Sequence, residues 1–84
     1  MDEKIVKILS EKLNESLNES NGIMKLILSF TNVDSDSLYM GIVIGRLYNS
    51  FFYQHRRILK RDPSNDEFEE FIDFIQSNRK LLDD

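Results

Sequence analysis

The sequence contains no cysteine, one proline and three glycines among 84 residues. Without cysteine there is no disulfide, no thiolate metal ligand and no cysteine nucleophile, and this absence fits a reducing compartment. Proline and glycine are the residues that most often interrupt regular structure, and here they are scarce. We therefore expect an all-α protein that forms one domain over residues 1–84.

Long apolar runs are also missing. No run reaches the roughly 18 residues that a membrane span needs. The first residues, MDEKIVKILSEK, mix acids with bases at once and do not form a signal peptide. The sequence therefore predicts a cytoplasmic protein with no membrane partner.

Acidic residues are absent from residues 37–61, which carry five bases, whereas residues 62–84 carry two bases and eight acids. This division predicts that the basic middle and the acidic end meet, within the chain or between copies. The net charge of −4 argues against nucleic acid as a partner.

Leucine and isoleucine spacing predicts a first helix over about residues 3–31. Asn21-Gly22 is typical of a turn, and glycine inside a helix costs about 1 kcal/mol relative to alanine. The helical spacing of apolar residues nevertheless continues past Gly22, through Ile23, Leu26, Ile27 and Phe30. Two alternatives stay open: one helix weakened or kinked near Gly22, or two helices with a short joint. The connector 31–36 follows, with good helix caps at Asp34, Ser35 and Asp36.

The central helix, about residues 36–61, is the most apolar part of the chain. Ile42 and Val43 fall on its polar side, so its first half is apolar almost all round, which indicates partners on more than one face. Asp62-Pro63 ends it. The wide apolar side of this predicted helix consists of Met40, Ile44, Leu47, Tyr48, Phe51, Phe52, His55, Ile58 and Leu59.

A capping box, Ser64 to Glu67, predicts the start of a last helix over about residues 65–81, with Phe68, Phe71, Ile72, Ile75 and Leu82 in its apolar stripe. The short connectors predict a long antiparallel hairpin of the first two helices with the shorter third helix beside it. A chain of 84 residues buries only about 60–65% of its unfolded surface, so we expect dimerisation to complete this helical bundle.

His55 is the only histidine and lies among apolar residues. We interpret it as a buried, hydrogen-bonded core residue. Two alternatives give it a functional role, as a pH-sensitive interface contact or as a phosphoacceptor. No serine, acid or second histidine is placed by the sequence to make a catalytic group with it. No P-loop, glycine-rich cradle or zinc spacing occurs. We expect no enzyme activity, no catalytic residue, no cofactor and no metal.

Gly41 and Gly45 are one turn apart in the central helix. They predict a point of closest helix crossing, within the chain or across a dimer, with chance spacing as the alternative. The basic end of this helix is predicted to pair with the acidic last helix, with phosphate binding as the alternative. Tyr39, Tyr53 and Phe74 are expected to be exposed edges that extend an apolar patch.

The sequence favours a small non-enzymatic protein–protein interaction module that self-associates as a homodimer through its central helix, with an unidentified protein as a further partner. The alternatives are a nucleic-acid-binding regulator that uses the basic end, and a small-ligand or signal-relay bundle with a site near His55. The predicted interaction residues are Gly41, Gly45, Tyr48, Phe52, His55, Arg56 and Arg57.

Overall fold

The computed structural model describes residues 1–30 and 34–83. Its elements in chain order are α1 (Glu3–Asn18), α2 (Ser20–Ile27), α3 (Ser35–Gln54), the π-helix η1 (His55–Leu59), α4 (Asn65–Ser77) and α5 (Arg79–Asp83). No strand occurs among these described residues, which confirms the all-α class.

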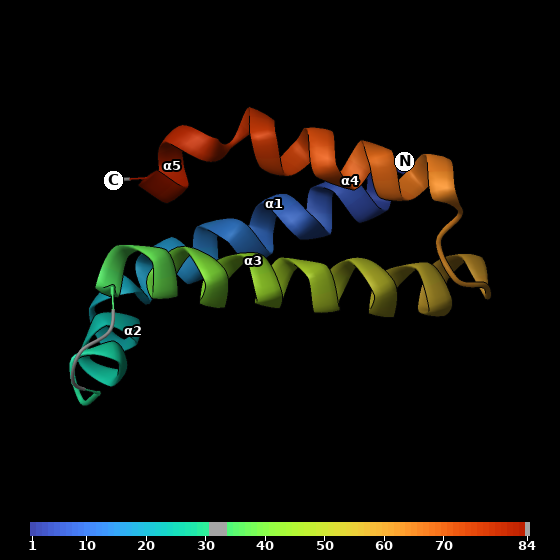
Figure 1. The fold of residues 1–84 in the computed structure, drawn as a ribbon. Helices are drawn as coiled ribbons and strands as arrows, with labels where there is room; N and C mark the ends of the chain where they lie inside the picture. The colour runs from blue at the N-terminus through green and yellow to red at the C-terminus, as the bar shows by residue number, and fades with distance from the viewer. Residues whose placement is uncertain (31–33, 84) are drawn as a thin grey trace.

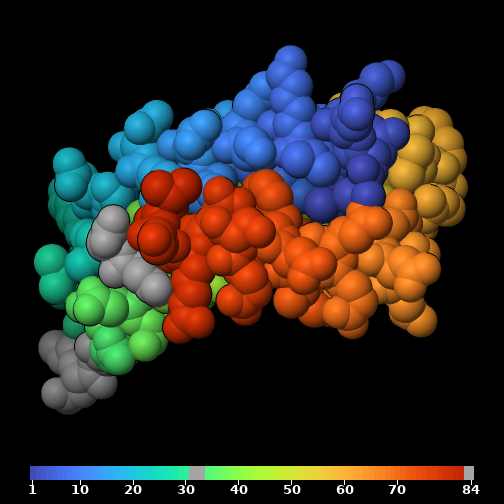
Figure 2. All heavy atoms as spheres, turned by 90° about the horizontal axis from the view of Figure 1, so that it is seen from above, coloured from blue at the N-terminus to red at the C-terminus, as the bar shows by residue number. Residues whose placement is uncertain are grey.

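The long helices form two layers. α1 and α4 lie side by side, and α3 runs beneath both of them (Figures 1 and 2). The chain is elongated along these helices, with extents of 41 × 21 × 20 Å. The N-terminal amino group pairs with Glu70, which ties the start of the chain to α4. Since both neighbours lie on one side of α3, the opposite side of α3 has no cover from them.

The core lies between these layers. Its buried residues on α3 are Tyr39, Val43, Leu47 and Phe51, one turn apart in succession. The other elements contribute Ile5, Leu9, Leu13, Ile23, Ile27, Phe71 and Leu82. Val43 was expected on the polar side and Tyr39 at an exposed edge; both expectations are wrong. α1 and α2 pack against the flank of α3 that carries Tyr39 and Val43, and this places the core there.

The first helical region is broken at Glu19, three residues before Gly22. Glu19 has φ −93° and ψ 9°, outside helical values, but its carbonyl oxygen accepts the amide hydrogen of Ile23, so helical bonding resumes at once. Gly22 lies inside α2. After the bend Ile23 and Ile27 are buried, whereas Leu26 is 56% exposed. The continuous helix is therefore not what the structure shows, and the joint is not at the glycine.

α3 begins where the caps predicted it. Oδ1 of Asp34 accepts the amide hydrogens of Asp36 and Ser37, at 3.1 and 3.2 Å. These bonds, the one from Ser37 above all, lower the pKa of the Asp34 carboxyl. Asp34 is thus the N-cap, and Asp36 lies in the first turn, where an acid suits the helix dipole. Residues 31–33 of the predicted connector lie outside the described residues.

The other two helix ends depart from the predicted bounds. α3 changes to the π-helix at His55, and Lys60 ends it in the left-handed conformation, φ 61°, two residues before Asp62. The predicted last helix divides at Asn78 into α4 and α5, and this division lets Leu82 turn into the core. The capping box of α4 is confirmed, because Ser64 and Glu67 each accept the other's amide hydrogen.

No helix within residues 1–30 and 34–83 combines the length and the apolar character that crossing a membrane requires.

Candidate interaction face

Beside its buried stripe, α3 carries a second row of residues, some exposed and some partly buried, that borders α4 at Tyr48. We call it the open face; it consists of Leu38, Gly41, Ile42, Gly45, Tyr48, Asn49, Phe52, Tyr53 and Arg56. Five of them, Leu38, Gly41, Gly45, Tyr48 and Phe52, follow one another at steps of three and four residues. That spacing is the one with which a helix presents a seam to a partner helix.

Gly41 and Gly45 are the smallest part of this face. Both are exposed, and a Cβ atom built on either would meet nothing within 4 Å. The expected helix crossing at these glycines therefore does not occur within the described chain. Two explanations of the pair remain: a crossing between copies, or chance spacing.

Tyr48 and Phe52 form the aromatic part of the face, next to α4. The Tyr48 ring centroid lies 4.9 Å from that of Phe52, 6.4 Å from Phe68 and 6.2 Å from Phe71. These edge and tilted contacts are worth about 0.5–1.5 kcal/mol each beyond area burial, and they hold the rings in place. Tyr48 still exposes 46% of its surface. The face thus presents ordered aromatic edges to solvent.

Three of the five basic residues in the segment 37–61 are paired with acids inside the chain. Arg46 binds Glu19 at 2.7 Å, Arg56 binds Asp62 at 2.5 Å and Arg61 binds Glu67 at 2.6 Å. The last of these joins the basic end to α4, as expected, but the other two do not. The guanidinium of Arg56 also lies 5.5 Å from the centre of the Phe52 ring, a cation–π contact at the end of the open face.

Arg57 lies apart from the open face. It borders a hollow that Lys4, Lys7, Ile8 and Glu11 of α1 also line, and its Nε donates a hydrogen bond to Gln54 at 3.0 Å. The structure therefore separates Arg56 from Arg57 and brings only Arg56 to the predicted interaction residues.

His55 is fully buried, in agreement with its interpretation as a core residue. Its Nδ1 lies 2.8 Å from the carbonyl oxygen of Phe51, and its ring packs 4.5 Å from the Phe51 ring. Nε2 is 3.4 Å from an Oε atom of Glu67 but lacks the geometry of a hydrogen bond. His55 is thus not on the open face.

Glu67 connects the end of α3 to the start of α4. Its carboxylate accepts two hydrogen bonds from Arg61, at 2.6 and 3.1 Å, and one from the amide of Ser64 at 2.9 Å. The Arg61 bonds are the main reason that the pKa of Glu67 falls to about 2. This charged junction ties the end of η1 to the start of α4, and α4 in turn supplies the rings of Phe68 and Phe71 that contact Tyr48.

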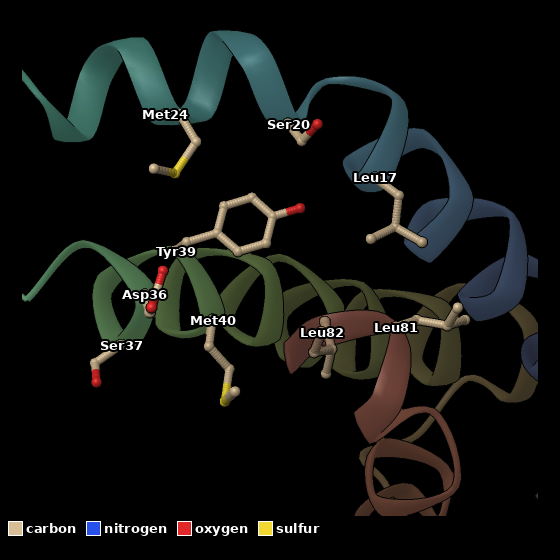
Figure 3. Close-up of a pocket in the computed structure, with 9 residues that line it drawn as sticks. All are labelled: Leu17, Ser20, Met24, Asp36, Ser37, Tyr39, Met40, Leu81 and Leu82. Carbon is tan, nitrogen blue, oxygen red and sulfur yellow. The ribbon is translucent and has the colours of Figure 1, made fainter. Parts of the chain in front are cut away.

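A groove of about 450 Å³ lies near the other end of α3, between α1, α2, α3 and α5. Figure 3 shows the Tyr39 ring between Met24 of α2 and Asp36, with Leu17, Leu81 and Leu82 to one side. The sequence did not indicate this groove, because its walls come from four segments and no local spacing marks it. It lies away from His55, where the small-ligand alternative expected a site.

Metal-binding side chains do not gather in the part of the chain that the structure describes. No group of three or more His, Cys, Asp or Glu side chains there can hold a metal ion. Asp34 and Asp36 both lie at the start of α3, where Asp34 is the N-cap and Asp36 belongs to the first turn.

Comparison with models of protein families, with curated proteins and with solved structures gives no match for this chain.

Proposed function

We propose that this protein is a small non-enzymatic interaction module that self-associates through the open face of α3. One observation carries the proposal. α1 and α4 pack on the same side of α3 (Figure 1), and Gly41 and Gly45 of α3 are exposed with nothing within 4 Å of an added Cβ atom. Tyr48, on the flank next to α4, still exposes 46% of its surface.

The composition of the row supports a helix as the partner. A helical glycine in solvent costs about 1 kcal/mol relative to alanine, so two of them on one exposed face weaken α3 without any gain inside the chain. Their gain arises when another backbone comes close, because the missing side chains let helix axes approach. Exposed aromatic rings beside such a gap supply the apolar area that association buries.

The basic end supports nucleic-acid binding less well. Three of its arginines, Arg46, Arg56 and Arg61, already pair with acids of the same chain. Phosphate contacts would have to replace those pairs, at a cost in affinity. A mobility-shift titration with duplex DNA and RNA at low salt tests this alternative: a salt-dependent shift that Arg56→Ala reduces would favour it over self-association.

Light scattering behind size exclusion, over a dilution series, tests the proposal. We expect a mass of about 20 kDa, twice the 10.0 kDa of the chain, that falls toward the monomer on dilution, as for a reversible dimer. The variant Gly45→Leu fills the space above the open face. We expect it to lower the association constant of the dimer at least tenfold, which corresponds to about 1.4 kcal/mol.

Gly22→Leu is the matched control. Gly22 is also a helical glycine with nothing within 4 Å of a Cβ, but it lies on α2. We expect this variant to associate like the wild type, and circular dichroism to show that both variants are folded. A wild-type chain that stays monomeric at tens of micromolar, or two leucine variants with equal effects, would refute the proposal.

A further inference from the structure

We infer that His55 and Glu67 form a proton-binding site inside the chain, through which pH controls how firmly the start of α4 is attached to η1. The inference goes beyond the proposed self-association and does not depend on it, because both residues belong to one chain. It rests on the two oxygen acceptors that lie beside the buried His55 ring, one at each ring nitrogen.

The proton on one ring nitrogen is assigned by its neighbour. Nδ1 lies 2.8 Å from the carbonyl oxygen of Phe51, and a carbonyl oxygen can only accept a hydrogen bond. If the neutral ring carried its proton on Nε2 instead, two acceptors would face each other at that distance with no hydrogen between them. The neutral ring of His55 therefore has its proton on Nδ1 and a bare lone pair on Nε2.

The other ring nitrogen lies beside a negative charge. Nε2 is buried, has no hydrogen-bond partner in the described part of the chain, and lies 3.4 Å from Oε2 of Glu67. The Arg61 hydrogen bonds are the main cause that lowers the pKa of Glu67 to about 2, so the carboxylate is ionised above that pH. A second proton, on Nε2, replaces the contact between a lone pair and a carboxylate with an ion pair.

Two effects oppose the second proton. Burial disfavours a charged ring, because it takes the charge out of water. The guanidinium of Arg61 repels a charged ring too, but Arg61 is 51% exposed and solvent screens it. The Glu67 carboxylate is 14% exposed and close to the ring, so its attraction is screened much less. We expect this attraction to prevail within the range in which histidine ordinarily titrates, about pH 5–8.

No other carboxylate of the described residues lies within 4 Å of a His55 ring nitrogen. The remaining charged side chains on the elements around the ring are exposed to solvent. They are Lys4, Lys7 and Glu11 of α1, Arg56 and Arg57 of η1, Lys60 after it, and Glu70 of α4, which binds the amino group of Met1. Glu67 is thus the group that sets the response of the ring to pH.

Loss of the second proton acts on the start of α4. The Glu67 carboxylate also accepts the amide hydrogen of Ser64 at 2.9 Å and binds Arg61, so the capping box and the ion pair both depend on its position. Once Nε2 is bare, its lone pair repels this carboxylate. We therefore expect the attachment of α4 to η1 to weaken as the pH rises and His55 becomes neutral.

NMR spectra of the ¹⁵N-labelled protein report the proton on each ring nitrogen, and the single histidine gives one ring signal to follow. At pH 5.5 we expect protons on both nitrogens, and at pH 8 a proton on Nδ1 alone. Glu67→Gln removes the charge and should lower the pH at which the second proton binds by about one unit or more. Glu69→Gln, at an exposed residue of the same helix, is the matched control and should behave like the wild type.

Urea denaturation reports the effect on α4. The folded wild-type chain loses a stabilising proton as the pH rises, so its unfolding constant should increase about threefold or more between pH 5.5 and pH 8. The constant should stay nearly unchanged in Glu67→Gln. A wild-type ring with one proton at pH 5.5, a neutral ring protonated on Nε2, or equal shifts in the two variants would overturn the proton site. The wild-type spectra decide the first two outcomes even if Glu67→Gln does not fold. Protonation without a change in the unfolding constant would overturn the control of α4.

Discussion

Replacing Glu67 with glutamine removes a charge at the junction of α3 and α4 while keeping the size and one acceptor oxygen of the side chain. Glu67 is only 14% exposed and binds Arg61 through two hydrogen bonds, at 2.6 and 3.1 Å. Glutamine retains an oxygen for the amide of Ser64, so the capping box is largely preserved. The substitution therefore isolates the charge from the cap.

The pKa of Glu67 gives the size of the effect. It falls from 4.5 to about 2, mainly through the Arg61 hydrogen bonds. A difference of this size corresponds to at most about 3 kcal/mol of folding free energy. Arg61 is 51% exposed, so solvent screens the pair and we expect about 1–2 kcal/mol. Because the pKa is lowered on folding, this stability is present above pH 4.5 and is lost as the pH falls toward 2.

Urea denaturation of wild type and Glu67→Gln from pH 7 to pH 2 measures it. We expect the variant to be less stable by about 1–2 kcal/mol at pH 7 and the difference to vanish near pH 2. Glu69→Gln is the control, since Glu69 is exposed on the same helix and forms no ion pair among the described residues. A pH-independent difference for Glu67→Gln, or an equal loss for Glu69→Gln, would refute the role of the charge.

Three further substitutions test the core, the cap of α4 and the glycine inside α2. Phe51→Ala removes a fully buried ring at the centre of the aromatic cluster and is expected to cost about 3–5 kcal/mol in chemical denaturation, whereas Tyr53→Ala, at a residue 59% exposed, should cost under about 0.5 kcal/mol. Ser64→Ala removes the cap of α4, and we expect a loss of about 1 kcal/mol with a lower helical signal. Gly22→Ala meets nothing within 4 Å and should raise the free energy of unfolding by about 0.5–1 kcal/mol; a loss of stability would show that α2 needs glycine at this position.

The proposed dimer gives a reason for features that the isolated chain does not explain. The exposed glycines of α3 lower its helix propensity, and the exposed Tyr48 edge leaves apolar surface in water. In the proposed dimer a second helix covers both.

Features set by neighbouring residues could be predicted from the sequence. The capping box of α4 and the cap of α3 depend on side chains two or three residues from the amides they bind, and both were located correctly. The burial of His55 and Phe51 followed from their place among apolar residues. The interaction role of Gly41, Gly45, Tyr48 and Phe52 stays a prediction, whereas His55, predicted with them, lies in the core.

Features set by contacts across the chain could not be predicted. The bend falls at Glu19, a residue with good helix propensity, because packing of Ile23 and Ile27 against the core decides the direction of α2. The groove at Met24, Tyr39 and Leu82 exists only where four segments, α1, α2, α3 and α5, meet.

The amino-acid sequence by itself determined the all-α class, the caps and the apolar character of the central helix, because each of these depends on residue type and on spacing within a few turns. The tertiary structure decided which side of that helix is covered. A helix that is apolar nearly all round offers its neighbours a choice of sides, and only the packing of α1 and α4 buried Val43 and left Gly41 and Gly45 open.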